Sequence, residues 1–160
     1  MPDMLVKLFD LPEVTPCCTA LADQGIVIRQ AMAYEKSLVV DWVGTTFGPG
    51  WASETDVAFA NLPISCYIAT ENSKVIGFAC YESTCRDYFG PTGVSEECRG
   101  KGIGKALFLS CLHAMAAIGY AYAIIGGAGP TEFYRKVAGA VEIEGSKPGI
   151  YRDMLKRSDD

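Results

Sequence analysis

Hydrophobic residues along this chain gather in two kinds of pattern, and the first is typical of β-strands. Short apolar or alternating stretches rich in Val, Ile, Tyr and Phe lie between turn residues. Residues 71–74, ENSK, separate two of these stretches and predict a hairpin turn. Gly90 and Pro91 interrupt another stretch and indicate a bulge or an irregular edge. The predicted strands are residues 4–11, 26–32, 65–70, 75–84, 87–94, 120–127, 140–145 and 149–154.

The second pattern repeats every three to four residues, as amphipathic helices do. It is clearest in residues 103–118, where apolar side chains recur at helical spacing. Ser53 is expected to cap a helix, with Asp56 three residues further on. The predicted helices are residues 33–47, residues 48–62 after an initial turn, residues 103–118 and residues 130–138, with an irregular or short helical link at 14–23.

A long uncharged run could be mistaken for a membrane span. No Asp, Glu, Lys or Arg occurs from Ala106 to Thr131, which is enough chain to cross a bilayer. Gly119 divides the run, however, and the residues after it are strand formers. The run therefore predicts a buried helix leading into a buried strand, and no membrane association is expected.

Composition limits the class of protein. A chain of 160 residues with 49% hydrophobic and 21% charged residues is expected to form one globular domain. The net charge of −5 argues against nucleic-acid binding, which requires a basic face. The seven cysteines form no CxxC pair and no zinc-type spacing, and the N-terminus does not resemble a signal peptide. We therefore expect a reduced, cytoplasmic protein without a metal site.

The stretch VSEECRGKGIGKAL, residues 94–107, carries the strongest chemical signal. A Walker phosphate loop is excluded, because Arg99 stands where its first glycine belongs and Ala106 follows Lys105. The dinucleotide motif G-x-G-x-x-G fails as well, because position 105 is Lys. A merely flexible turn would leave the clustered basic residues unexplained. The pattern favours a pyrophosphate cradle, in which backbone N–H groups at a helix N-terminus converge on an anion.

Here the sequence resembles the GNAT N-acetyltransferase superfamily. Residues 99–104, RGKGIG, match the family motif R/Q-x-x-G-x-G/A, and FYRKVAGA resembles the family's later tyrosine motif. The resemblance covers about residues 26–155 and leaves residues 1–25 as an extra N-terminal strand and link. It implies an α/β (α+β) fold, with a mixed, mostly antiparallel sheet of about seven strands flanked by helices.

The resemblance also implies an activity and its site. The activity would be direct transfer of an acetyl group from acetyl-CoA to an amine on a small molecule or peptide, and the protein could form a homodimer. Tyr134 would be the general acid that protonates the leaving thiolate. The cosubstrate would be held by Val94, Arg99, Gly100, Lys101, Gly102, Ile103, Gly104 and Lys105. A non-catalytic acyl-CoA-binding regulatory domain is the alternative, and a nucleotide-binding domain of another fold is a third hypothesis.

Several other residues are candidates for a catalytic, binding or structural role. Asp87, Glu82 and Tyr81 are candidates for the general base. Glu54 and Asp56 could attract a cation, although a solvated surface position is the simpler interpretation. Structural positions are expected for His113, Trp42, Phe47, Trp51 and Tyr151, the last as a strand residue.

Overall fold

The computed structural model describes residues 1–158 and places a single seven-stranded sheet at the centre of the chain. Its strand order is β2-β3-β4-β5-β6-β1-β7, and every neighbouring pair is antiparallel except β5 and β6. The predicted mixed, mostly antiparallel sheet of about seven strands is therefore confirmed. The strands are β1 (Met4–Lys7), β2 (Ile26–Gln30), β3 (Cys66–Glu71), β4 (Lys74–Tyr81), β5 (Tyr88–Val94), β6 (Tyr122–Ile125) and β7 (Val141–Glu142).

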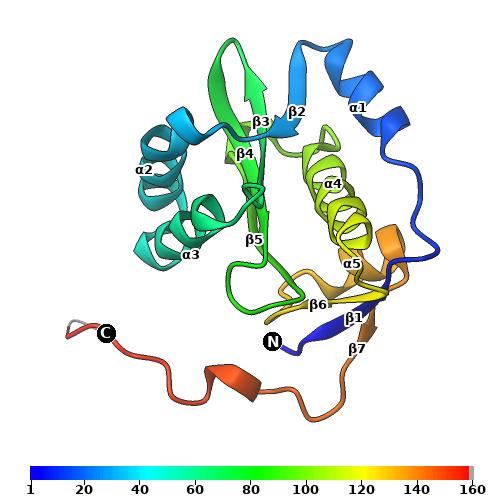
Figure 1. The fold of residues 1–160 in the computed structure, drawn as a ribbon, viewed down its shortest axis with the longest axis vertical. Coiled ribbons are helices and arrows are strands. Elements are labelled where there is room, and N and C mark those ends of the chain that lie inside the picture. The colour runs from blue at the N-terminus through cyan, green and yellow to red at the C-terminus, as the bar shows by residue number, and fades with distance from the viewer. Residues whose placement is uncertain (159–160) are drawn as a thin grey trace.

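Helices cover both faces of the sheet (Figure 1). One face packs against α1, α4 and α5 around Phe108 and Met115, and the other packs against α2 and α3 around Val43 and Phe78. Helices are needed on both faces because the central strands carry apolar side chains on both sides, which must be buried. The helices are α1 (Thr15–Ala22), α2 (Lys36–Phe47), α3 (Pro49–Ala60), α4 (Ile103–Ala117) and α5 (Thr131–Ala138).

The N-terminal strand lies inside the sheet rather than at its edge. Strand β1 pairs antiparallel with β6 through Met4↔Ile125, and with β7 through Met4↔Glu142. Met4 and Val6 are fully buried, because both side chains point into the core beneath α4 and α5. Residues 1–25 are thus part of the packed domain, and β1 completes the half of the sheet that carries β6.

Local sequence signals explain several boundaries. Asn72 and Ser73 both have positive φ, which matches the tight hairpin turn that connects antiparallel strands. Helix α4 ends just before Gly119, and the left-handed Gly139 caps the end of α5. Because α4 and β6 are separate elements, the uncharged run is divided as the sequence predicted. Within residues 1–158, no helix combines the length and the apolar character that a membrane crossing requires.

Three predictions about local structure were wrong. The C-terminal strand predicted at 149–154 is a 3-10 turn, Gly149–Tyr151, followed by an exposed extended segment, so no terminal hairpin forms. The strand predicted at residues 140–145 is shorter: β7 has two residues, because it pairs with β1 only at Met4 and Leu5. Ser53 does not cap α3, which begins at Pro49 with Gly48 before it. The Ser53 hydroxyl donates instead to the Pro49 carbonyl within the helix, at 3.0 Å.

Candidate functional site

Strands β5 and β6 pair only at one end and then separate. Their parallel register is Tyr88↔Ile124 and Phe89↔Ile125, after which β6 ends while β5 continues to Val94. The separation begins at Gly90, which has a φ of +117°, and the register with β4 shifts opposite this point. The predicted bulge at Gly90–Pro91 is therefore confirmed. It leaves the β6-facing edge of residues 90–94 without a strand partner.

The glycine-rich stretch follows β5 at the open end of this separation. Gly102, with φ +89° and ψ +9°, takes the left-handed conformation immediately before α4. The backbone N–H groups of residues 102–105 donate no hydrogen bond within the described chain. The N-terminus of α4 thus presents several donors together with the positive end of the helix dipole, an arrangement that attracts anions.

Folding alone does not require a glycine at position 104. Its φ lies outside the left-handed region, so its backbone conformation suits any residue. A Cβ atom there would meet only Val94 Cγ2, at 3.9 Å, which is an ordinary van der Waals contact. Alanine would therefore fit and would favour the helix by about 0.5–1 kcal/mol. Glycine or alanine here leaves the N–H groups at the start of α4 open to a ligand, whereas a branched side chain would cover them.

Three basic side chains surround the same surface. Arg99, Lys101 and Lys105 are exposed, and none of them forms an ion pair with another residue in the described part of the chain. Their charges are therefore available to a bound anion, although the whole chain carries a net charge of −5. The structure brings these three residues together with Val94, Gly100, Gly102, Ile103 and Gly104, the remaining residues of the predicted cosubstrate site. The Ile103 side chain is buried in the core, so this residue can offer only its backbone to a ligand.

Tyr134 lies in α5, within a group of aromatic rings on the α4 side of the β5–β6 separation. Its ring centroid is 6.2 Å from that of Phe89 and 5.0 Å from that of Phe108. Burial raises the pKa of its phenol to about 12, so the hydroxyl stays protonated at neutral pH. Although the residue is only 5% exposed, its hydroxyl has no hydrogen-bond partner among residues 1–158. Buried tyrosines usually find one, so this hydroxyl is available to a ligand.

The three candidate bases lie away from the open part of the separation. Tyr81 is buried in the core beneath α4, and burial raises its pKa to about 12. Glu82 and Asp87 meet in the β4–β5 loop, where the Glu82 carboxylate accepts a hydrogen bond from the Asp87 N–H. The Asp87 carbonyl in turn accepts from Ile124 N at 2.9 Å, at the closed end of the pairing. Burial, and then the Glu82 charge, raise the pKa of Asp87 to about 6.

The other candidates take mostly structural positions. His113 Nε2 lies 2.8 Å from the Pro12 carbonyl and fastens α4 to the N-terminal segment. Trp42, Phe47 and Trp51 stack around Phe78 between the sheet and α2–α3. Asp56 pairs with Lys36 at 2.8 Å, whereas Glu54 accepts a hydrogen bond from the Thr84 hydroxyl.

Sequence reasoning missed a group of residues at the end of β6. A Cβ atom on Gly126 would lie 2.6 Å from the Tyr151 hydroxyl oxygen and 2.8 Å from Tyr88 Cδ2. Asp3 lies beside them, and its Oδ1 accepts a hydrogen bond from Gly127 N at 2.8 Å. The two glycines at 126–127, directly after a strand, are the sequence signal that another side chain could approach the backbone here. Because Tyr151 was expected in a strand, its contact with Gly126 was not predicted.

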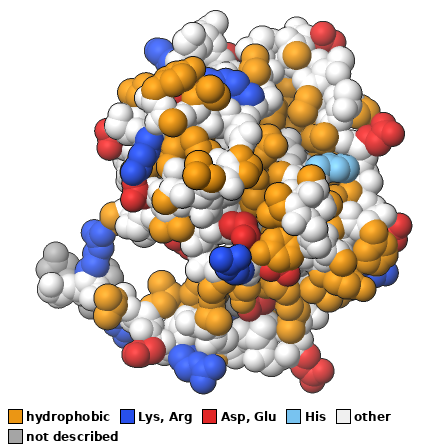
Figure 2. Space-filling view, in the orientation of Figure 1, with side chains coloured by type: hydrophobic (Ala, Val, Ile, Leu, Met, Phe, Trp, Pro, Cys, Tyr) orange, Lys and Arg blue, Asp and Glu red, His pale blue; other side chains and the backbone are white. Residues whose placement is uncertain are grey.

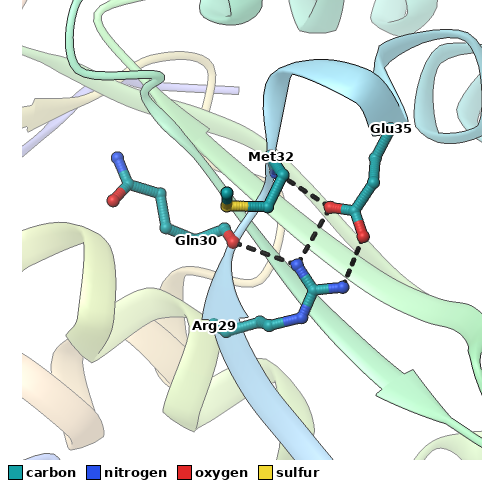
Figure 3. A network of polar contacts seen from close by, with 4 residues as sticks. All are labelled: Arg29, Gln30, Met32 and Glu35. Atoms are coloured by element: carbon teal, nitrogen blue, oxygen red, sulfur yellow. Dashed lines mark hydrogen bonds and ion pairs between the residues drawn. The ribbon is translucent and has the colours of Figure 1, made fainter.

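A separate pocket of about 430 Å³ opens at the other edge of the sheet, between β2, the β3–β4 turn and α2. One wall is a polar network in which Arg29 binds Glu35 through both guanidinium ends (Figure 3). Glu35 Oε2 lies 2.9 Å from Arg29 Nη1 and also accepts from Met32 N at 2.8 Å. The pairing raises the pKa of Arg29 and lowers that of Glu35. With its charges paired, the network fixes the start of α2 against β2. Within residues 1–158, no group of three His, Cys, Asp or Glu side chains could hold a metal ion.

Comparison with known proteins places these features in a family. A family model described as "Acetyltransferase (GNAT) domain" matches residues 63–137, which include β5, the glycine-rich stretch and Tyr134. A search of the curated proteins found no significant match.

Solved structures with the same fold share little sequence with this chain. The glucosamine N-acetyltransferase region of a fungal multi-domain GH3 β-N-acetylglucosaminidase is 16% identical, with a TM-score of 0.71 over 89% of this chain and 19% of that one. A GCN5-related N-acetyltransferase from Sphaerobacter thermophilus is 18% identical, with a TM-score of 0.67 over 89% of this chain and 48% of that one. A GCN5-related N-acetyltransferase from Kribbella flavida is 15% identical, with a TM-score of 0.57 over 88% and 53% of the two chains.

The chain thus spans about half the length of the two bacterial proteins, and about one fifth of the fungal one. At these identities the similarity concerns the fold, and it excludes a nucleotide-binding domain of another fold. Together with the match of the acetyltransferase (GNAT) domain model to residues 63–137, it confirms the resemblance that the sequence indicated: the chain has the GNAT fold and is similar to the GNAT acetyltransferases.

Proposed function

We propose that this protein is an N-acetyltransferase that moves an acetyl group from acetyl-CoA to a primary amine by direct attack. The observation that carries the proposal is the open backbone surface of residues 102–105, at the mouth of the separation between β5 and β6. An anion-binding helix N-terminus beside an unpaired strand edge suits a ligand with a pyrophosphate and an extended amide-bearing arm.

The residues present fit acetyl-CoA. The N–H groups at the start of α4, with Arg99, Lys101 and Lys105 around them, would hold its pyrophosphate. The free edge of β5 up to Val94 would hold the pantetheine arm, because its backbone has no partner on the β6 side. Bound there, acetyl-CoA would supply the activated acetyl thioester. The free N–H groups and the absence of a side chain at Gly104 support this fit, since together they leave the start of α4 open to an anion.

Tyr134 would supply a proton near the thioester sulfur. Because burial raises its pKa to about 12, its hydroxyl remains a hydrogen-bond donor at every physiological pH. The same shift makes it a weaker acid than an ordinary phenol, so its contribution is expected at the lower end of the range for general acids. An alkylammonium acceptor is neutral in only about one molecule in 2,500 at pH 7, so a second group or a water chain must take its proton.

The alternative is a non-catalytic domain that binds acyl-CoA. One observation favours it: Glu82 and Asp87, two of the candidate bases, meet at the closed end of the β5–β6 pairing. A single assay distinguishes the two functions: the protein is incubated with acetyl-CoA and a panel of primary amines. An N-acetyltransferase releases free CoA thiol and an N-acetylated product of the expected mass. Tight binding of acetyl-CoA with no product from any amine would support the non-catalytic alternative and overturn the proposal.

A further inference from the structure

Tyr151 reaches the β5–β6 separation from the face of the sheet opposite Tyr134. Its hydroxyl lies 2.6 Å from the position that a Cβ atom of Gly126 would occupy, and Gly126 is the first residue after β6. Gly126 is also the first residue beyond the last paired position, Phe89↔Ile125. The phenol is therefore next to the point where the two strands part. A Cβ atom at position 126 would force the Tyr151 phenol or the Tyr88 ring to move.

The alternation of side chains along β5 and β6 shows on which face of the sheet Tyr151 lies. Phe89 and Ile125 are buried in the core beneath α4, so their neighbours Tyr88 and Gly126 point to the α2–α3 side. Tyr151 and the Tyr88 ring both contact the Gly126 position, which puts Tyr151 on that side as well. The Glu54 charge, from α3, contributes to the raised pKa of Tyr151 after burial and the Asp3 charge.

Both chain termini cooperate to hold Tyr151 in place. Asp3 Oδ1 accepts from Gly127 N, and Asp3 N donates to Ser146 Oγ, in each case at 2.8 Å. Asp3 Oδ2 lies 3.7 Å from the Cβ position of Gly149, which begins the turn that carries Tyr151. The N-terminal strand thus fixes both the end of β6 and the start of the C-terminal segment.

The two faces of the separation differ in access. The α4–α5 face is filled by the rings of Phe89, Phe108, Phe133 and Tyr134. On the other face, Tyr88 and Tyr151 are only partly buried; the Tyr88 hydroxyl interacts with the Asp3 carboxylate, whereas the Tyr151 hydroxyl has no hydrogen-bond partner in the described chain. Figure 2 shows open space between the C-terminal segment and the body of the molecule on this side. A molecule approaching a thioester between the strands would arrive from here.

We propose that Tyr151 contacts the acceptor amine and positions its nitrogen against the thioester, and that the acceptor is an amine that arrives as a cation. This rests on the proposed N-acetyltransferase function. The Tyr151 hydroxyl oxygen accepts a hydrogen bond from the ammonium, and the Tyr88 and Tyr151 rings offer faces that attract a cation. The negative charges of Asp3 and Glu54 act on Tyr151 and favour a positive over a neutral molecule there.

The test compares Tyr151→Phe with the wild type and with the control Tyr34→Phe, whose side chain is 79% exposed outside the site. Benzylamine, cationic at pH 7, and aniline, neutral at pH 7, are the probes, alongside the best amine of the panel. Loss of a hydrogen bond to a charged group is expected to lower kcat/KM for the cationic amines by about 10- to 100-fold. The calorimetric Kd for acetyl-CoA should stay within about twofold of the wild type, because Tyr151 does not contact the cradle.

The outcomes separate this inference from the function on which it rests. If the wild type forms product but Tyr151→Phe matches it in kcat/KM for the amine, the role of Tyr151 is overturned while the N-acetyltransferase function stands. Equal use of aniline and benzylamine would overturn the preference for a cation. If the wild type acetylates no amine at all, the proposed function fails, and this inference fails with it.

Discussion

The Asp3 carboxylate accepts a hydrogen bond at 2.8 Å from the backbone N–H of Gly127, a residue 124 positions further along the chain. Asp3 is 6% exposed, although it lies only three residues from the start of the sequence. The bond ties the N-terminal strand to the segment that follows β6, at the point where β5 and β6 have separated. A contact between the chain terminus and residue 127 thus helps to shape the candidate site.

Asp3→Ala is expected to lower the free energy of unfolding by about 1–3 kcal/mol, because it leaves the Gly127 N–H without its partner. Asp3→Asn is the matched control, since an amide oxygen can still accept that bond. Denaturant unfolding followed by circular dichroism measures both variants. Equal stability of Asp3→Ala and the wild type would show that the bond does not hold the end of β6.

Tyr134→Phe is expected to lower kcat by about 10- to 100-fold, with little change in KM for acetyl-CoA. The variant keeps the ring contacts with Phe89 and Phe108 and loses only the hydroxyl, which has no partner among residues 1–158. Steady-state kinetics on an acetylated amine measures the effect, with Tyr122→Phe as a control on the exposed end of β6. Full kcat in Tyr134→Phe would make this tyrosine a packing residue.

Asp87→Asn is expected to stabilise the protein at pH 7.5. Burial, followed by the Glu82 charge, raises the Asp87 pKa from 3.8 to about 6, and its Oδ1 has no hydrogen-bond partner. Because the folded-state pKa exceeds the unfolded one, the folded protein binds the proton more tightly. Stability therefore falls as the pH rises from about 4 to about 6. Asparagine removes the buried charge and tolerates the φ of +65° at this position.

The gain from Asp87→Asn should be about 1–2 kcal/mol at pH 7.5, after allowance for partial solvent screening, and should shrink toward pH 4.5. Urea unfolding at the two pH values measures it, and Asp10→Asn, at an exposed position, serves as the control. An Asp87→Asn gain that is absent at pH 7.5, or that is equal at both pH values, would contradict a strained carboxylate at this position.

The sequence predicted those features whose cause is local. The period of apolar residues located α4, the ENSK turn located the β3–β4 hairpin, and Gly90–Pro91 located the bulge that parts β5 from β6. The glycine-rich stretch indicated the anion-binding surface, because glycine at a helix N-terminus has a specific backbone consequence. None of these inferences required knowledge of a distant partner.

Features that depend on contacts between distant segments were not predictable in the same way. Nothing in Met4–Lys7 indicates that this strand would lie between β6 and β7, or that it would hold Asp3 against Gly127. The residues at 149–154 have strand propensity, yet they form a turn that presents Tyr151 to Gly126. Tertiary context overrode propensity there: β1 is the strand partner of β7 in the described chain, and residues 149–151 form a turn against Gly126 instead.

The proposed binding of acetyl-CoA depends most on the open N-terminus of α4, and substitution of Gly104 tests it most directly. Gly104→Ala adds a Cβ that meets only Val94 at 3.9 Å, and it should raise the free energy of unfolding by about 0.5–1 kcal/mol while preserving acetyl-CoA binding. Gly104→Val adds branched methyl groups over the free N–H groups of residues 102–105 and should block the approach of the pyrophosphate.

The decisive measurement is the Kd for acetyl-CoA by titration calorimetry on the wild type, Gly104→Ala and Gly104→Val, with circular dichroism to confirm that each is folded. We predict that the wild type and Gly104→Ala bind acetyl-CoA, and that Gly104→Val binds at least about 100-fold more weakly, because several charge-assisted hydrogen bonds are lost. Wild-type affinity in folded Gly104→Val, or no binding by the wild type, would contradict this prediction.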